Sequence, residues 1–235
     1  MVTKSNIPQG LFENNDEGVP EVFRPKIITI NEFGTFCANQ FENAFNSVSN
    51  SIQPYIVLSI NSPGGSVFEL HQMRDLISVS RKPVVGFGGG MVFSAASILL
   101  TSCTKGHRWM SPNSKLMIHE VATSSEGKSS DIISEAMETE KLNDELFEIL
   151  AKNAGKPKLF FKNLIRKKNN ADFFLSAEEC KKYGLIDHVG VPEFKMDVDV
   201  KWSVEALPLS SGKTAKNKTK TKGNKVDKVV SETKK

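Results

Sequence analysis

The sequence predicts one α/β domain built on a mainly parallel β-sheet with right-handed crossovers. Between residues 26 and 119, short apolar runs alternate with segments whose apolar residues recur at helical spacing. The run from Tyr55 to Ile60 is almost continuously apolar, which is typical of a parallel strand covered on both faces. The order strand, helix, strand, helix favours crossover connections of one hand.

The expected elements follow in chain order. Apolar runs predict strands over residues 26–30, 55–60, 84–87 and 115–119. Helical spacing predicts helices over residues 35–49, 66–78, from about 94 onward, and over 131–153. The first helix is expected to bury Phe36, Phe41, Phe45 and Val48, and the last a stripe of leucine and isoleucine. The three glycines at 88–90 are expected to turn the chain into the helix at Ser94, and Ser130 is expected to cap the last helix.

The two ends of the chain differ from this core. Residues 1–25 read as an irregular segment, residues 26–200 as the folded domain and residues 201–235 as a tail. Residues 210–235 carry nine lysines against two acidic residues, or +7, so the net charge of +4 leaves −3 for residues 1–209. Such a tail is expected to be disordered, and we interpret it as solubilising rather than as a site for nucleic acid or an acidic partner.

Composition is that of an ordinary globular protein, with 39% hydrophobic and 25% charged residues. No apolar run approaches the roughly 20 residues that span a bilayer. The N-terminus lacks the apolar block of a secretory signal. Three scattered cysteines, Cys37, Cys103 and Cys180, lack the spacing of metal ligands. We therefore expect a cytoplasmic protein with reduced thiols, no bound metal and no membrane partner.

Ser94 is the candidate nucleophile. It follows a glycine-rich stretch and opens a helix, whose N-terminal N–H groups favour negative charge developing beside the hydroxyl. A helix cap is the alternative role for this serine, and the local pattern gives the two roles equal weight. Ser97 lies one turn farther along and is expected to point inward.

His119 is the candidate general base. It ends the strand KLMIH, and side chains at the C-terminal edge of an open α/β sheet often form sites. Imidazole is the usual base for a serine hydroxyl, and a purely structural histidine is the alternative. None of the other histidines, His71, His107 and His188, ends a strand next to a glycine-rich turn.

An acid and an oxyanion site complete the parts needed for acyl transfer. Asp172 could orient His119, but Asp187 is a rival, and the residues alone leave this choice open. Gly64 and Gly65, in the segment SPGG after a buried strand, permit a backbone turn that presents N–H groups. We expect the amides of Gly65 and Ala95 to hold an oxyanion.

Four segments together resemble the Clp protease proteolytic subunit family. They are INSPGGSV, SAASILL after a glycine-rich turn, PNSKLMIHE, and FLSAEECKKYGLID, and the resemblance spans about residues 26–190. It implies Ser94 as nucleophile, His119 as base, Asp172 rather than Asp187 as acid, and the amides of Gly65 and Ala95 as the oxyanion hole.

The resemblance also implies an architecture and partners. The fold would be a crotonase-like α/β spiral with the long helix after His119 as a handle. The subunit would hydrolyse unfolded proteins inside a chamber of one or two heptameric rings, as a heptamer or tetradecamer. An AAA+ unfoldase would use ATP to feed the chamber, and this chain itself would need no cofactor.

Several residues depart from the family pattern. Phe93 replaces a small residue, Ala95 a methionine, Glu120-Val121 a Gln-Pro pair and Ala171 an arginine that helps to couple rings. An insertion separates His119 from Asp172, and the N-terminal segment matches poorly. Two alternatives follow: a phage head maturation protease on the same fold, favoured by the divergent pocket and lysine-rich tail, and a non-catalytic ring subunit, which the intact Ser/His/Asp set disfavours.

Overall fold

The computed structural model describes residues 25–169 and 171–194. Nearly all of the predicted N-terminal segment, and the whole of the predicted tail over residues 201–235, lie outside these residues. The described part contains seven strands: β1 (Ile27–Ile30), β2 (Ile56–Ser62), β3 (Val84–Phe93), β4 (Arg108–Met110), β5 (Lys115–Ile118), β6 (Phe173–Ser176) and β7 (His188–Val189). The expected α/β class is confirmed.

The strands form one sheet in the order β1-β2-β3-β4-β7, and β5 branches from it. β5 pairs with the last part of β3, and β6 pairs with β5. Every pairing is parallel except the antiparallel β5–β6 ladder. Parallel neighbours end at the same edge of a sheet, so side chains that follow β3 and β5 can meet there.

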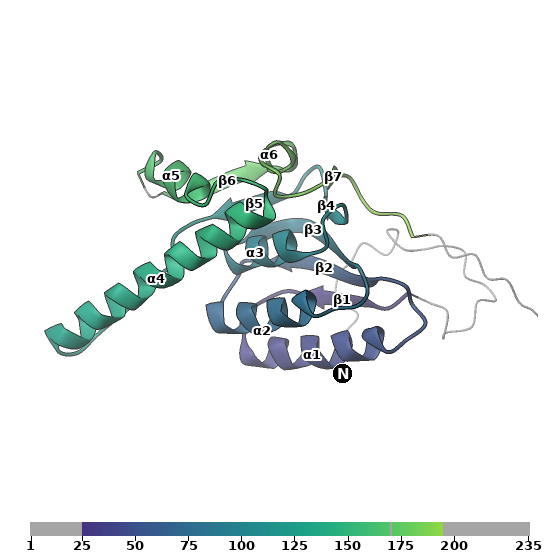
Figure 1. Ribbon diagram of the computed structural model, residues 1–235, viewed down its shortest axis with the longest axis horizontal. Helices are drawn as coiled ribbons and strands as arrows, with labels where there is room; N and C mark the ends of the chain where they lie inside the picture. The colour runs from purple at the N-terminus through teal and green to yellow at the C-terminus, as the bar shows by residue number, and fades with distance from the viewer. Residues whose placement is uncertain (1–24, 170, 195–235) are drawn as a thin grey trace, which may run out of the picture. The chain divides into compact units, whose positions relative to one another are not determined.

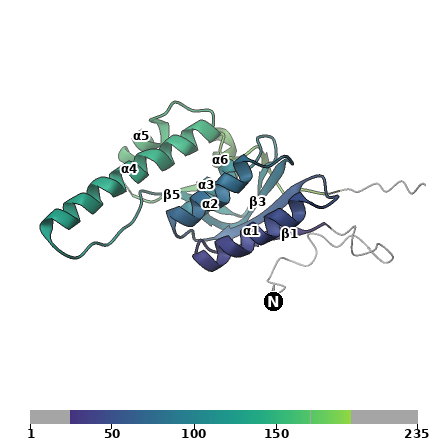
Figure 2. The same cartoon turned by 60° about the horizontal axis from the view of Figure 1, so that its bottom comes forward.

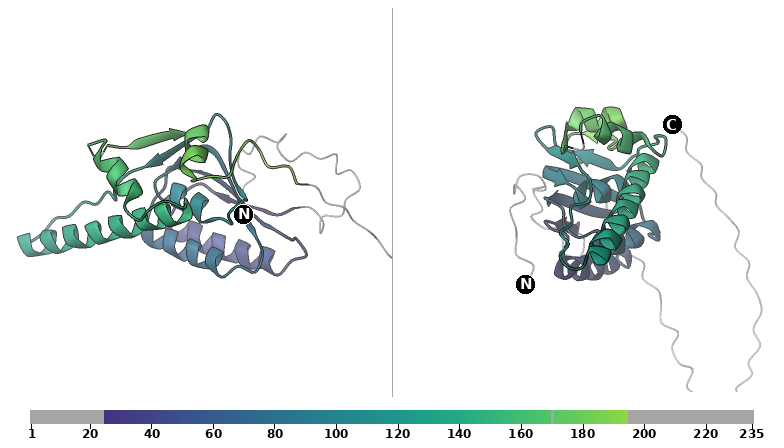
Figure 3. Two further views of the ribbon diagram at one scale, coloured as in Figure 1. Left: turned by 45° about the horizontal axis from the view of Figure 1, so that its top comes forward. Right: turned by 90° about the vertical axis from the view of Figure 1, so that its left-hand side faces the viewer.

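Six helices accompany the sheet in the described residues: α1 (Thr35–Ser49), α2 (Val67–Ser78), α3 (Ala95–Ser102), α4 (Ser129–Asn153), α5 (Phe160–Arg166) and α6 (Ala177–Tyr183). Each of α1 to α4 contacts the next helix along the chain (Figure 1). The purple and blue helices α1 and α2 lie at one end of the sheet, and the green α5 and α6 lie at the other end (Figure 3). Their apolar residues join the strands in one core.

Helix α4 is packed along only part of its length. Its C-terminal half buries Leu146, Phe147 and Leu150, whereas Ile133 and Met137 near its start are exposed. The segment after β5 runs out to the far tip of α4, and the helix returns from there to the body (Figure 2). The prediction of a long helix is confirmed, but the buried stripe is wrong for its first half, because that half extends beyond the body.

The glycines at 88–90 do not form the predicted turn. They lie inside β3, which pairs with β4 up to Gly88 and with β5 from Met91 onward. Gly90, with φ of 71°, stands at this change of partner. A glycine tolerates the bend that a sheet needs where one strand switches neighbours. The turn into α3 falls later, at Ser94 itself.

Two smaller predictions were also wrong. Helix α4 starts at Ser129 with Lys128 as its N-cap, so Ser130 caps nothing. Phe36 is 72% exposed, and Ala38 takes its place in the buried face of α1 beside Phe41, Phe45 and Val48. Phe36 lies in the first turn of α1, where the spacing of apolar residues alone does not reveal whether the core reaches that far.

Two of the three cysteines are buried in the core. All three are free thiols, and burial raises the pKa of both Cys103 and Cys180 to about 12. Within residues 25–169 and 171–194, no helix has the length and apolar character of a membrane span. Nor do three or more His, Cys, Asp or Glu side chains in these ranges gather as metal ligands could.

Candidate active site

Ser94 and His119 lie in hydrogen-bonding contact. Their Oγ and Nε2 atoms are 2.7 Å apart, within the range of a strong O–H···N bond. Ser94 follows Phe93, the last residue of β3, and His119 follows Ile118, the last residue of β5. Because Phe93 and Met117 are paired in the parallel β3–β5 ladder, both side chains emerge at the same sheet edge.

The backbone at Ser94 turns sharply. Its φ of 55° and ψ of −122° are sparsely populated for a residue with a side chain. Two contacts hold the turn: the Ser94 N–H donates to the carbonyl of Met117 at 2.9 Å, and the buried Ser97 hydroxyl donates to the Ser94 carbonyl at 2.6 Å. The Ser94 side chain makes no capping bond to α3. Ser94 thus occupies the N-cap position of α3 without the side-chain bond of a cap, and its hydroxyl contacts His119 instead.

Asp172 lies on the other side of the imidazole. Its Oδ1 is 3.8 Å from Nδ1 of His119, which is an ion-pair distance rather than a hydrogen bond. Asp172 directly precedes β6, whose first residue, Phe173, pairs with Ile118. The antiparallel register thus places Asp172 beside His119. The Asp172 side chain is 55% exposed, so it can move by the roughly 1 Å needed to accept a hydrogen bond.

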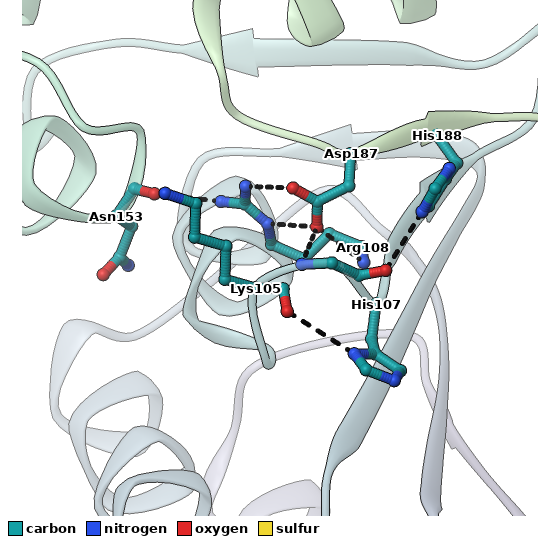
Figure 4. Close-up of polar contacts among 7 residues, drawn as sticks. Lys105, His107, Arg108, Asn153, Asp187 and His188 are labelled. Atoms are coloured by element: carbon teal, nitrogen blue, oxygen red, sulfur yellow. Dashed lines mark hydrogen bonds and ion pairs between the residues drawn. The ribbon is translucent and has the colours of Figure 1, made fainter.

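The rival carboxylate, Asp187, forms an ion pair with Arg108 and does not contact His119 in the described residues (Figure 4). Its two oxygens accept from Nε and Nη2 of Arg108, at 2.9 and 2.6 Å, and Oδ2 also accepts from the Gly106 N–H at 2.7 Å. Burial opposes ionisation of Asp187, but the hydrogen bonds and charge of Arg108 prevail and keep its pKa below the ordinary value. Arg108 itself is buried and also donates to the carbonyl of Asn153. The bond from Arg108 to Asn153 joins β4 to the end of α4.

Gly64 and Gly65 bring the backbone against Ser94. A Cβ on Gly64 would stand 2.7 Å from the Ser94 Cβ, and one on Gly65 would stand 2.4 Å from the Phe33 carbonyl oxygen. Both glycines have positive φ, 104° and 148°. The buried Ser62 hydroxyl accepts from the Gly64 N–H at 3.1 Å and fixes the turn.

The two predicted oxyanion donors are unpaired. Neither the Gly65 N–H nor the Ala95 N–H has a hydrogen-bond acceptor in the described residues. Ala95 is the first residue of α3, where an N–H group has no partner within its own helix. Both residues line the same cavity as Ser94 and His119. The arrangement can therefore present two N–H groups to an oxygen that gains negative charge beside the serine.

A cavity of about 360 Å³ opens beside Ser94. Its walls come mainly from apolar side chains of α2, α3, β5, α4 and the segment after His119: Val67, Leu70, Ile98, Met117, Val121, Leu146, Phe147 and Leu150. Such a cavity can take one large side chain of a bound chain. Sequence reasoning did not find it, because its walls come from four separate stretches of chain, one of them the C-terminal half of α4.

Asn143 of α4 was also missed. It lines the cavity, and its Oδ1 accepts from the Val121 N–H at 2.6 Å. A polar residue on the packed side of an otherwise apolar helix face was the signal that could have drawn attention to it. A second feature without a sequence signal is the edge-to-face contact of Phe93 with Phe174, with ring centroids 5.5 Å apart, next to the serine.

Comparison with known proteins is consistent with this geometry. The Clp protease family model matches residues 22–193 of the chain. The ATP-dependent Clp protease proteolytic subunit 1 of Rhodopirellula baltica is 37% identical over 146 residues, which are 61% of this chain and 63% of that protein. The match thus spans somewhat less than two thirds of the relative's length.

Proposed function

Because this chain belongs to the Clp protease family, we propose that it is a serine peptidase that cleaves peptide bonds in unfolded protein segments. The single observation that carries the proposal is the 2.7 Å contact between Ser94 Oγ and His119 Nε2. A serine hydroxyl is a weak nucleophile until a base within hydrogen-bonding reach takes its proton. Nε2 of His119 lies within that reach of Ser94 Oγ, and both residues line the cavity, which supports the proposal.

The reaction proceeds in two halves. Ser94 Oγ attacks the peptide carbonyl carbon while Nε2 of His119 accepts the hydroxyl proton, and the amides of Gly65 and Ala95 stabilise the oxyanion. The C–N bond then breaks as His119 gives its proton to the leaving amine. Water, deprotonated by His119, attacks the acyl-serine, and the proton returns to Ser94 as the acid product leaves. Every role is filled by a group of this chain, so the proposal includes no cofactor.

Asp172 acts through His119. Its carboxylate holds the imidazole with Nδ1–H toward the acid and Nε2 toward Ser94, and it stabilises the imidazolium that forms in each half of the reaction. This role requires the 3.8 Å separation to shorten when substrate binds. Catalytic contacts that are long in a free enzyme and tighten in the complex are common.

The cavity beside Ser94 receives the side chain of the residue whose carbonyl is attacked. Its lining includes both Ser94 and the two proposed oxyanion amides, so a side chain in the cavity would position the adjoining carbonyl over the serine. Its largely apolar walls favour a large uncharged side chain. The assignment is compatible with an extended segment as substrate, because one side chain can then enter the cavity while its carbonyl lies at Ser94.

We further propose that the subunit works inside a ring-shaped chamber fed by an ATP-dependent unfoldase. The relative from Rhodopirellula baltica bears the name of an ATP-dependent protease subunit. Large apolar side chains are exposed on α1, α2 and the first half of α4, among them Phe36, Phe68, Ile133 and Met137. Exposed apolar groups of this size favour burial against other copies of the chain. The long α4 is the handle in this proposal.

The Ser94→Ala variant tests the proposed activity. We expect it to lose cleavage of a fluorogenic peptide by at least about 10³-fold, because no other group replaces the nucleophile. Ser130→Ala, an exposed serine on α4, is the matched control and should cleave at the wild-type rate. Sedimentation should show the same assembly for all three proteins. Cleavage by Ser94→Ala at the wild-type rate would contradict the proposal. No cleavage by the wild type would favour a non-catalytic ring subunit.

A further inference from the structure

Asn143 is a buried polar residue in the wall of the cavity beside Ser94. Apart from Ser94 and His119, the lining includes two polar side chains, Ser66 and Asn143. Ser66 caps α2, and its hydroxyl accepts from the Phe68 N–H. Asn143 is only 6% exposed. A carboxamide buried to this degree is costly unless its hydrogen-bonding groups find partners.

The contact with Val121 fixes the orientation of the Asn143 carboxamide. The Val121 N–H donates to Oδ1 at 2.6 Å. The amide nitrogen of asparagine cannot accept a hydrogen bond, so the two ends of the group cannot be exchanged. Oδ1 therefore faces the segment after His119, and Nδ2, with its two donor hydrogens, lies at the other end of the carboxamide.

Nδ2 of Asn143 is an unused donor. It has no hydrogen-bond partner in the described residues. Within those residues, the side-chain atom that is both sealed from solvent and unpartnered is Oε2 of Glu69, so Nδ2 keeps some contact with solvent. The cavity is the open space that Asn143 lines. A side chain that fills the cavity and excludes solvent must therefore supply the acceptor for this donor, or the donor stays unpaired.

We propose that Nδ2 of Asn143 is a specificity-determining group for the residue whose carbonyl is attacked. It favours an uncharged side chain that carries a hydrogen-bond acceptor near its end, with glutamine as the natural example. This inference rests on the proposed peptidase function. An aliphatic side chain of the same length excludes solvent and leaves Nδ2 unpaired, whereas a terminal acceptor supplies the hydrogen bond. A charged side chain is disfavoured by the apolar walls.

The test uses three internally quenched peptides that differ at one position. They carry glutamine, methionine sulfone or norleucine at the cleaved residue. The glutamine side chain can donate and accept hydrogen bonds, the sulfone can only accept them, and the norleucine side chain can do neither. For Asn143→Leu we expect kcat/KM for the glutamine and sulfone peptides, each relative to norleucine, to fall roughly 10- to 100-fold. Circular dichroism and thermal unfolding check that the variant is folded.

Asn143→Asp is the matched variant. It keeps an oxygen for the Val121 N–H and nearly the same size, but it replaces the donor by an acceptor. At pH 8 we expect kcat/KM for the sulfone peptide, relative to norleucine, to fall. The same ratio for the glutamine peptide should fall less, because the glutamine amide can donate a hydrogen bond to the new carboxylate. A residue with only a structural role would lower all three rates in proportion.

The outcomes separate this inference from the proposed function. Cleavage of all three peptides with ratios that neither substitution changes would overturn the role of Asn143 and leave the peptidase proposal standing. Failure of the wild-type protein to cleave any of them would overturn the peptidase proposal, and the inference with it.

Discussion

Ile118 and Phe173 are paired in the antiparallel β5–β6 ladder, and this register positions the acid of the candidate triad. The residue after Ile118 is His119, and the residue before Phe173 is Asp172, so the two side chains leave neighbouring strands at the same edge. A shift of one residue in this register would turn every β6 side chain to the other face of the sheet. The geometry of the site thus depends on a strand pair outside the parallel part of the sheet.

Replacing Asp172 by asparagine should slow peptide cleavage while leaving substrate binding almost unchanged. The neutral amide cannot stabilise the imidazolium and can favour the wrong tautomer of His119. We expect kcat to fall about 100-fold or more, with KM changed by less than about threefold. Steady-state kinetics measures both values. Asp131→Asn, an exposed carboxylate in the first turn of α4, is the control; a kcat for Asp172→Asn equal to that of this control would contradict the assignment.

Replacing Asp187 by asparagine should affect stability. The change leaves the buried Arg108 guanidinium without a counter-charge, which costs about 3 kcal/mol of unfolding free energy at pH 7. Urea denaturation followed by circular dichroism measures this loss. The pKa of Asp187 is lower in the folded state than in the unfolded state. Its contribution is therefore complete above the ordinary carboxyl pKa and lost as the pH falls through the folded value.

The stability difference between the wild type and Asp187→Asn should accordingly shrink on acidification, from pH 6 toward pH 3. A difference that stays constant over this interval would show that the ionised carboxylate is not the stabilising form. The same pair of proteins, assayed for cleavage at pH 7 well below their unfolding temperatures, should retain comparable activity, since Asp187 does not touch the imidazole.

Replacing Gly64 by alanine should impair catalysis through a steric contact. The new Cβ would lie 2.7 Å from the Ser94 Cβ and 2.9 Å from the Phe93 carbonyl oxygen, both closer than atoms of these kinds pack. We expect kcat/KM to fall about 100-fold as the serine or its oxyanion amides are displaced. Gly155→Ala is the control, because Gly155 also has positive φ, 66°, but nothing within 4 Å of a new Cβ. Equal activity of the two variants would show that the contact between the new Cβ and Ser94 does not impair catalysis.

Much of the fold follows from local patterns. The apolar runs predicted β1, β2 and β5 to within a residue or two, because a parallel strand that is buried on both faces is an almost continuous apolar run in the sequence. The convergence of Ser94 and His119 could be predicted because both follow strands that end at one edge. The residues alone did not decide between Asp172 and Asp187, and the family resemblance was needed to favour Asp172. The β5–β6 register and the buried Arg108, which separate the two carboxylates in the structure, leave no local pattern.

The remaining errors share one physical cause. Gly88 to Gly90 form a strand that changes partner rather than a turn, and the partners, β4 and β5, lie later in the chain. Ile132 has the spacing of a buried residue but is 40% exposed, because the part of α4 that carries it extends past the body (Figure 2). The role of Asn143 depends in the same way on Val121, on a different segment. Local sequence indicates which residues could be buried or turned, and tertiary pairing decides which are.

The central claim is that His119 activates the Ser94 hydroxyl, and covalent labelling with a fluorophosphonate tests it most directly. The reagent reacts with a serine whose proton a neighbouring base removes. Mass spectrometry of the digested wild-type protein should find one labelled peptide, carrying the adduct on Ser94, and the adduct should disappear in His119→Ala. An adduct on another serine, or equal labelling of Ser94 without His119, would contradict the account.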